Sequence, residues 1–134
     1  MDMTLRWYGS KLDSVTLQQI RQIPGVTGVI SALHEIPAGE PWPEADVIAL
    51  KKEIEAAGLK LLGIESINVH EDIKLGSPNR DQLIENYIIS LESVGKADIH
   101  LVCYNFMPIF DWTRTDLAFP LPDGSNALAY DKQV

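Results

Sequence analysis

The sequence predicts an α/β fold built around a parallel β-sheet. Four short runs of β-branched and apolar residues are separated by three segments with helical periodicity, in the order β-α-β-α-β-α-β. The runs are almost continuously apolar, which is typical of strands buried on both faces of a parallel sheet. Because each predicted helix is followed within a few residues by a strand, we expect right-handed crossover connections.

The first predicted strand and helix are bounded by clear local signals. The helix covers Val15–Ile23, with Ser14 as the expected N-cap and Pro24-Gly25 as the stop. Leu17 and Ile20 give it an apolar face. The four predicted strands are Met3–Tyr8, Val26–Leu33, Leu59–Ile67 and Ile99–Asn105.

Two longer helices are predicted between the later strands. One begins near Pro43, which suits a first helical turn, and ends at Gly58 as the expected C-terminal cap. Its predicted core-facing residues are Val47, Leu50, Ile54 and Ala57. The other begins near Ser77-Pro78-Asn79 and ends at Gly95. Its predicted stripe is Leu83, Tyr87, Ile88 and Leu91.

Composition excludes several classes of protein. The chain has 134 residues, a net charge of −8 and no cluster of basic residues, so we expect neither nucleic acid nor an anionic membrane as partner. A single cysteine, Cys103, rules out a disulfide within the chain and fits a reducing cytosol; we expect it to be a small buried core residue. The N-terminus lacks a signal-peptide layout and no apolar run is long enough to span a membrane, so a cytoplasmic protein is expected.

The connections between the predicted elements are asymmetric. Helix-to-strand connections are short, whereas strand-to-helix connections are long and rich in His, Asn, Asp, Glu and Trp. A (β/α)₈ TIM barrel carries its active site on connections of the second kind and typically needs about 250 residues. With four predicted strands and three helices, residues 1–134 are expected to form a single incomplete domain, the N-terminal half of such a barrel.

Candidate substrate-binding residues lie at the ends of the first three strands. Trp7 is either a core aromatic residue or part of an aromatic wall for a substrate. His34 is a candidate because it follows the second strand directly. Asn68 and His70 belong to a dense polar segment after the third strand, which is either a solvated loop or a set of acid–base and hydrogen-bonding groups. His70 is the candidate catalytic residue.

The connection after the fourth strand adds three candidates. Asn105 stands at the predicted strand tip, and Trp112 and Arg114 follow in a segment that also carries two acids. Arg114 could hold a substrate carboxylate through two parallel hydrogen bonds, or form a salt bridge that only shapes the loop. We expect Arg114, Asn105, His70 and Trp7 to converge on one cavity.

These segments resemble the mannonate dehydratase family. The similarity extends in order over essentially the whole chain and is most specific in the segment Tyr104–Asp116. It is carried by Arg6-Trp7-Tyr8-Gly9, Val26-Thr27-Gly28-Val29, Ser31-Ala32-Leu33-His34, the segments Val69–Lys74, Val102–Pro108 and Asp111–Leu117, and Leu121-Pro122-Asp123-Gly124-Ser125.

The resemblance implies a TIM barrel related in architecture to xylose isomerase. It implies a lyase that converts D-mannonate to 2-keto-3-deoxy-D-gluconate and water in hexuronate (glucuronate) catabolism, with Mn²⁺ or Fe²⁺ as cofactor. The family's metal ligands are His, Cys, His and Asp on later strands, which would lie beyond Val134, so the resemblance places no metal ligand in this chain. Cys103 does not match the ligand cysteine.

Two other interpretations stay open at this point. The chain could be a non-catalytic remnant that persists as a half-barrel dimer, because half a barrel leaves open sheet edges that invite pairing. A related sugar isomerase or epimerase is also possible, since one fold hosts many chemistries. We expect a homo-oligomer, and no activity from the 134 residues alone.

Overall fold

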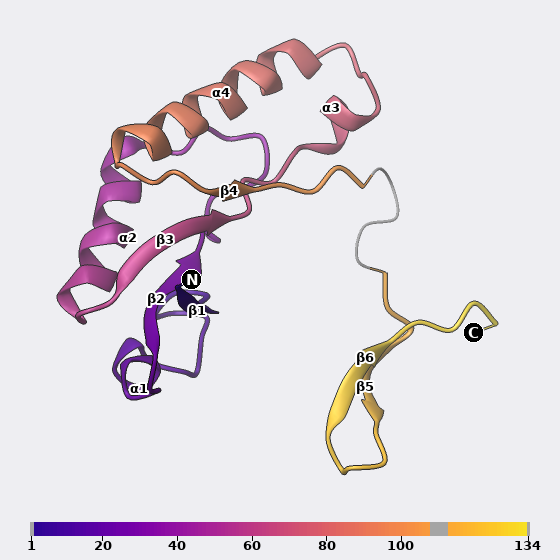
Figure 1. The fold of residues 1–134 in the computed structure, drawn as a ribbon. Helices are drawn as coiled ribbons and strands as arrows, with labels where there is room; N and C mark the ends of the chain where they lie inside the picture. Colours follow the sequence, from indigo (N-terminus) through magenta and orange to yellow (C-terminus); the bar gives the residue numbers. More distant parts are fainter. Residues whose placement is uncertain (1, 108–112, 134) are drawn as a thin grey trace.

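The fold is centred on a parallel sheet of four strands in the order β1-β2-β3-β4, as Figure 1 shows. The computed structural model describes residues 2–107 and 113–133. The strands of the sheet are β1 (Met3–Arg6), β2 (Val26–Ser31), β3 (Lys60–Glu65) and β4 (Val102–Cys103). The helices are α1 (Leu17–Arg21), α2 (Glu44–Ala56), α3 (Glu71–Lys74) and α4 (Arg80–Lys96). The predicted strand–helix alternation is therefore confirmed, and the short α3 adds one helix to the three expected.

All neighbouring strands of the sheet are parallel and consecutive in sequence. Arg6 is paired with Ile30, Ser31 with Ile64, and Glu65 with Cys103. The carboxyl ends of the four strands therefore meet at one edge, where the long connections begin. This is the arrangement of the first half of a (β/α)₈ barrel, whose active site lies at that edge.

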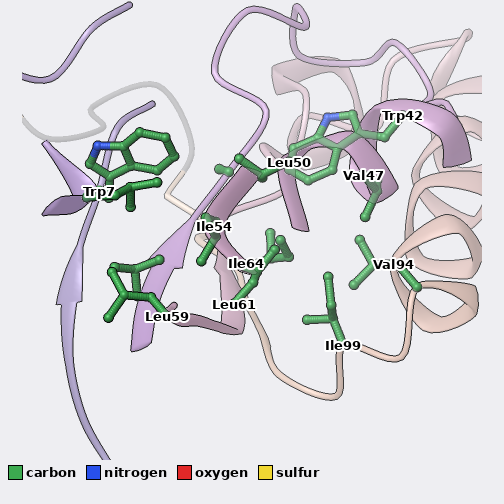
Figure 2. Packing of buried hydrophobic residues seen from close by; sticks show 14 of the residues in the cluster. Trp7, Trp42, Val47, Leu50, Ile54, Leu59, Leu61, Ile64, Val94 and Ile99 are labelled. Atoms are coloured by element: carbon green, nitrogen blue, oxygen red, sulfur yellow. The ribbon is translucent and has the colours of Figure 1, made fainter. Parts of the chain in front are cut away.

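The core lies between the sheet and helices α2 and α4, as Figure 2 shows. Fully buried residues of the strands, Val29 and Ile64, belong to the same cluster as Val47, Ile54 and Val94 of the helices. Burying each such side chain contributes about 1.5–3 kcal/mol. The predicted inner face of α2 is confirmed, with Ala57 partly buried at its end.

Backbone geometry explains two glycines in this layer. Gly58 follows the α2 C-cap with a φ of +78°, a conformation that costs glycine little, so the predicted helix end is confirmed within one residue. Gly28 lies where strands approach closely, because a Cβ there would stand 2.5 Å from the Lys60 carbonyl oxygen.

The N-terminus of α1 differs from the prediction by two residues. Thr16, not Ser14, is the N-cap, and it forms a capping box with Gln19. The Thr16 hydroxyl accepts from the Gln19 amide, while the Gln19 side chain accepts from the Thr16 amide. The reciprocal pair satisfies two otherwise unpaired donors, which a lone serine further upstream would not do.

The predicted buried face of α4 is wrong in part. Leu83 and Tyr87 are partly buried, but Ile88 and Leu91 are 41% and 38% exposed. The residues buried on α4 are Ser90, Ser93 and Val94. The helix also continues past Gly95 to Lys96, and the chain turns at Asp98, whose φ is +58°.

Two features near the C-terminal end were not expected. The first is an antiparallel hairpin of β5 (Asp116–Pro120) and β6 (Asn126–Ala129), a region in which no strand was predicted. The hairpin stands away from the four-stranded sheet in Figure 1. Cys103 is exposed rather than buried, because β4 is an edge strand of the sheet.

Among the described residues, no helix is both long and apolar enough to span a membrane.

Candidate active-site edge

A small polar cavity of about 130 Å³ opens at the carboxyl ends of β1, β2 and β3. Its lining includes Arg6 at the end of β1, His34 after β2, and Glu65 and Asn68 at and after the end of β3. Two of the candidates predicted from sequence, His34 and Asn68, are thus brought together. Such convergent polar groups are typical of a binding site for a small hydroxylated ligand.

Arg6 links two elements of this edge. Its guanidinium lies 4.4 Å from the centre of the Tyr8 ring and 3.5 Å from a Glu65 carboxylate oxygen. The cation–π contact and the ion pair fix the orientation of the guanidinium. Both charged side chains are partly exposed, so we expect the ion pair to add little to stability and to act mainly through orientation.

His34 also packs against Tyr8. The two ring centres are 5.2 Å apart. Burial of the imidazole, followed by the nearby positive charge of Arg6, lowers the pKa of His34 from its ordinary value. The ring is therefore neutral at pH 7. Its Nε2 atom is buried and has no hydrogen-bond partner within the described ranges 2–107 and 113–133.

A larger cavity of about 410 Å³ adjoins the first one on the side of α2. Tyr8 and His34 line it together with Lys11, Glu35 and Glu53. Lys11 and Glu35 form an exposed ion pair of 2.9 Å across its rim. His34 lines both cavities and is therefore the most central polar group of the edge.

Asn68 and His70 lie at the start of the connection after β3. The Ser66 hydroxyl donates to Asn68 Oδ1 over 3.2 Å. His70 is the N-cap of α3, and its Nδ1 accepts a hydrogen bond of 3.1 Å from the Asp72 amide. With Nδ1 used as an acceptor, a neutral His70 carries its proton on Nε2, which leaves that atom as a donor. The Nδ1 atom of His70 is thus already engaged, and its role as the catalytic residue stays a prediction.

The remaining predicted candidates lie elsewhere. Trp7 is 2% exposed, and its indole Nε1 donates to the Val15 carbonyl over 3.2 Å, so its observed contacts are those of a core residue. Asn105 is exposed, and the Arg114 guanidinium donates to the Thr113 carbonyl over 2.8 Å. Trp112 lies outside the described residues. Neither Trp7, His70, Asn105 nor Arg114 lines the polar cavity, and their roles in substrate binding stay predictions.

Sequence reasoning considered Tyr8 with Trp7 as a possible aromatic wall, but it did not select Arg6 or Glu65. A usable signal was present, because Arg6 and Glu65 are the final residues of two parallel strands and stand at the edge where barrel sites form. Arg6 and Glu65 were not selected because each lies within a predicted strand that is mostly apolar.

The described residues do not fit the metal that the resemblance implies. In residues 2–107 and 113–133, no group of three or more His, Cys, Asp or Glu side chains is arranged to hold a metal ion.

The chain has a parallel sheet packed against helices, with a polar cavity at the carboxyl ends of the strands. These features are typical of part of a (β/α)-barrel enzyme. Comparison with known proteins gives the family. The family model described as D-mannonate dehydratase (UxuA) matches residues 1–134, so the chain belongs to the mannonate dehydratase family.

Curated relatives and a solved structure agree with this assignment. The mannonate dehydratase of Brachyspira hyodysenteriae is 61% identical over 134 residues, which is all of this chain and 38% of the relative. That of Thermotoga petrophila is 58% identical over the same length and is covered to 37%. The crystal structure of mannonate dehydratase from Streptococcus suis serotype 2 is 57% identical, with a TM-score of 0.94, over 99% of this chain and 38% of that one. The chain thus spans well under half the length of these relatives.

Proposed function

We propose that the chain supplies part of the substrate site of a mannonate dehydratase, a carbon–oxygen lyase that converts D-mannonate to 2-keto-3-deoxy-D-gluconate and water. The enzyme would act in the cytoplasm, in hexuronate catabolism. The observation that supports this proposal is the polar cavity at the strand ends, where Arg6, His34, Glu65 and Asn68 meet in a chain of this family. Residues 1–134 would form one domain with the remainder of the barrel.

The reaction sets clear demands on such a site. A proton leaves C2 and the hydroxyl leaves C3, together forming water, and the resulting enol gives the 2-keto product. The enzyme must hold a flexible chain with several hydroxyl groups so that these two bonds are correctly placed. Neutral donors and acceptors such as the His34 imidazole and the Asn68 amide suit the hydroxyl groups, because they bind them without adding net charge.

The other predicted residues complete the proposal. His70 would donate a hydrogen bond through Nε2, since its Nδ1 already accepts from the Asp72 amide. Arg114 would hold the substrate carboxylate, with Asn105 and Trp112 beside it. Trp7 would act from the core by fixing the end of β1, because its carbonyl accepts a 2.7 Å hydrogen bond from the buried Ser31 hydroxyl.

We further propose that Mn²⁺ or Fe²⁺ serves the complete enzyme and is bound by residues outside this chain. The 134 residues alone would then have no dehydratase activity. We propose a homo-oligomer as the working form. Exposed apolar side chains of α4, among them Ile84, Ile88 and Leu91, offer a surface for such contacts.

A chimera tests this function. Residues 1–134 would replace the aligned segment of the Streptococcus suis enzyme, which is 57% identical and has the same fold over 99% of this chain. With D-mannonate and Mn²⁺, we expect the chimera to form 2-keto-3-deoxy-D-gluconate and the isolated chain to form none. A folded chimera without this activity, or one that isomerises an aldose instead, would refute the proposal. Circular dichroism establishes that the chimera is folded.

A further inference from the structure

The orphaned Nε2 atom of His34 is the feature of the strand-end cavity that most needs an explanation. Buried polar atoms are almost always hydrogen-bonded, because an unpaired one costs about 1–3 kcal/mol. Within the described part of the chain, His34 Nε2 is the only buried side-chain nitrogen or oxygen without a partner. His34 as a residue lines the cavity and does not belong to the apolar core cluster.

The surroundings of His34 determine which kind of ligand group can form a hydrogen bond with Nε2. The Tyr8 ring lies against the imidazole, with the ring planes at 31° to each other. The Arg6 guanidinium contacts the same Tyr8 ring and forms an ion pair with Glu65. A positive charge this close disfavours an imidazolium, so a ligand carboxylate would gain no ion pair from His34. A neutral hydroxyl group, which can both donate and accept, suits a neutral imidazole.

We infer that His34 is a specificity-determining residue, whose Nε2 forms a hydrogen bond with one of the C4, C5 or C6 hydroxyl groups of a sugar-acid substrate. These hydroxyls keep their bonds to carbon during the dehydration. The inference rests on the proposed function, since it assigns a contact within that same site. It goes further by assigning one atom of the protein to one class of group on the ligand.

The test compares substrates as well as variants. In the chimera described above, D-mannonate and its 4-deoxy, 5-deoxy and 6-deoxy analogues would be compared by kcat/KM. We expect one deoxy analogue to be about tenfold to a hundredfold poorer than D-mannonate, the range for one hydrogen bond to a buried group. In His34→Leu, which removes the nitrogen but keeps an apolar side chain, this preference should vanish for that analogue alone.

Two further variants separate recognition from structure. His34→Gln places an amide close to the position of Nε2, and we expect it to retain part of the preference. His100→Gln is the matched control, because His100 is highly exposed and precedes β4, at the opposite edge of the sheet. It should leave the whole substrate series unchanged. If His34→Leu lowers kcat/KM equally for all four substrates, the residue is only structural and the inference is wrong.

A direct measurement covers the case in which His34→Leu does not fold. The ¹⁵N resonance of His34 Nε2 would be followed in the metal-free, unsubstituted chimera as D-mannonate is added. We expect a saturable shift with D-mannonate and none with the deoxy analogue that lacks the contacted hydroxyl. A resonance that does not move for any of them would show that the substrate makes no contact with Nε2, and the inference would be wrong. A chimera that binds but does not dehydrate D-mannonate would refute the proposed function while leaving this contact to be decided by the shift.

Discussion

Replacing Ser90 by alanine tests how α4 is joined to the rest of the fold. The Ser90 side chain is fully buried, its hydroxyl oxygen accepts a 2.9 Å hydrogen bond from the Trp42 amide, and its hydroxyl donates to the Asn86 carbonyl over 3.0 Å. Ser90→Ala removes only the oxygen. The Trp42 amide, at a residue that is itself buried, then loses its acceptor.

The size of the effect follows from these contacts. A buried amide left without an acceptor costs about 1–3 kcal/mol. The higher helix propensity of alanine returns about 0.5 kcal/mol. We therefore expect Ser90→Ala to lower the free energy of unfolding by about 0.5–2.5 kcal/mol. With a urea dependence of about 2 kcal/mol per molar, the unfolding midpoint would fall by about 0.25–1.25 M.

The control for this prediction is Ser93→Ala, on the same buried face of α4. The described residues offer the Ser93 hydroxyl no hydrogen bond comparable to the one between Ser90 and Trp42, so the propensity gain should leave its stability unchanged or slightly raised. Urea unfolding followed by tryptophan fluorescence measures both variants. Equal midpoints for the two would show that the Ser90–Trp42 bond does not stabilise the fold.

Three further predictions follow from single contacts. Gly28→Ala should destabilise the chain by about 1–3 kcal/mol, because the new Cβ would clash with the Lys60 carbonyl oxygen. Gly95→Ala should stabilise the chain by up to about 1 kcal/mol, because Gly95 lies in a helix with open space around it. Equal unfolding midpoints for the two variants would contradict both expectations. The pKa of His34 is lower in the folded than in the unfolded chain, so the unfolded state takes up the proton first and stability should fall as pH drops through about 6.5. His34→Gln should flatten that slope in urea titrations between pH 7 and pH 5. Ile88→Lys should weaken self-association of the 134-residue chain in sedimentation experiments, and unchanged association would place the contact elsewhere.

Much of the sheet and all of the inner face of α2 could be predicted from the sequence. The strands are short apolar runs between turn residues, and Val47, Leu50 and Ile54 recur at helical spacing between Pro43 and Gly58. Local and tertiary preferences agree in this region, because the residues that favour a helix are also the ones that fill the core. Periodicity alone is then sufficient.

Periodicity failed for α4 because its apolar spacing does not mark the buried face. Ile88 and Leu91 are as regularly spaced as core residues, yet they are exposed, while Ser90 and Ser93 are buried. The hydrogen bond from the Trp42 amide to Ser90 stabilises this orientation, and it joins residues 48 positions apart. The spacing of residues within the helix cannot predict that contact.

The candidate site shows the same limit at the scale of one residue. Successive side chains of a strand point to opposite faces, so Trp7, which is buried in the core, directs its neighbours Arg6 and Tyr8 to the other face. There the Arg6 side chain reaches Glu65 over the end of β2, although β1 and β3 are not adjacent. Residues 3–7 do alternate between apolar and polar, but Met3 and Leu5 are exposed whereas Trp7 is buried, so the alternation alone does not predict which side chains line the site. The sequence could therefore indicate the edge of the sheet where the site lies. It could not indicate which residues line the site, because that depends on the face of the sheet to which each side chain points.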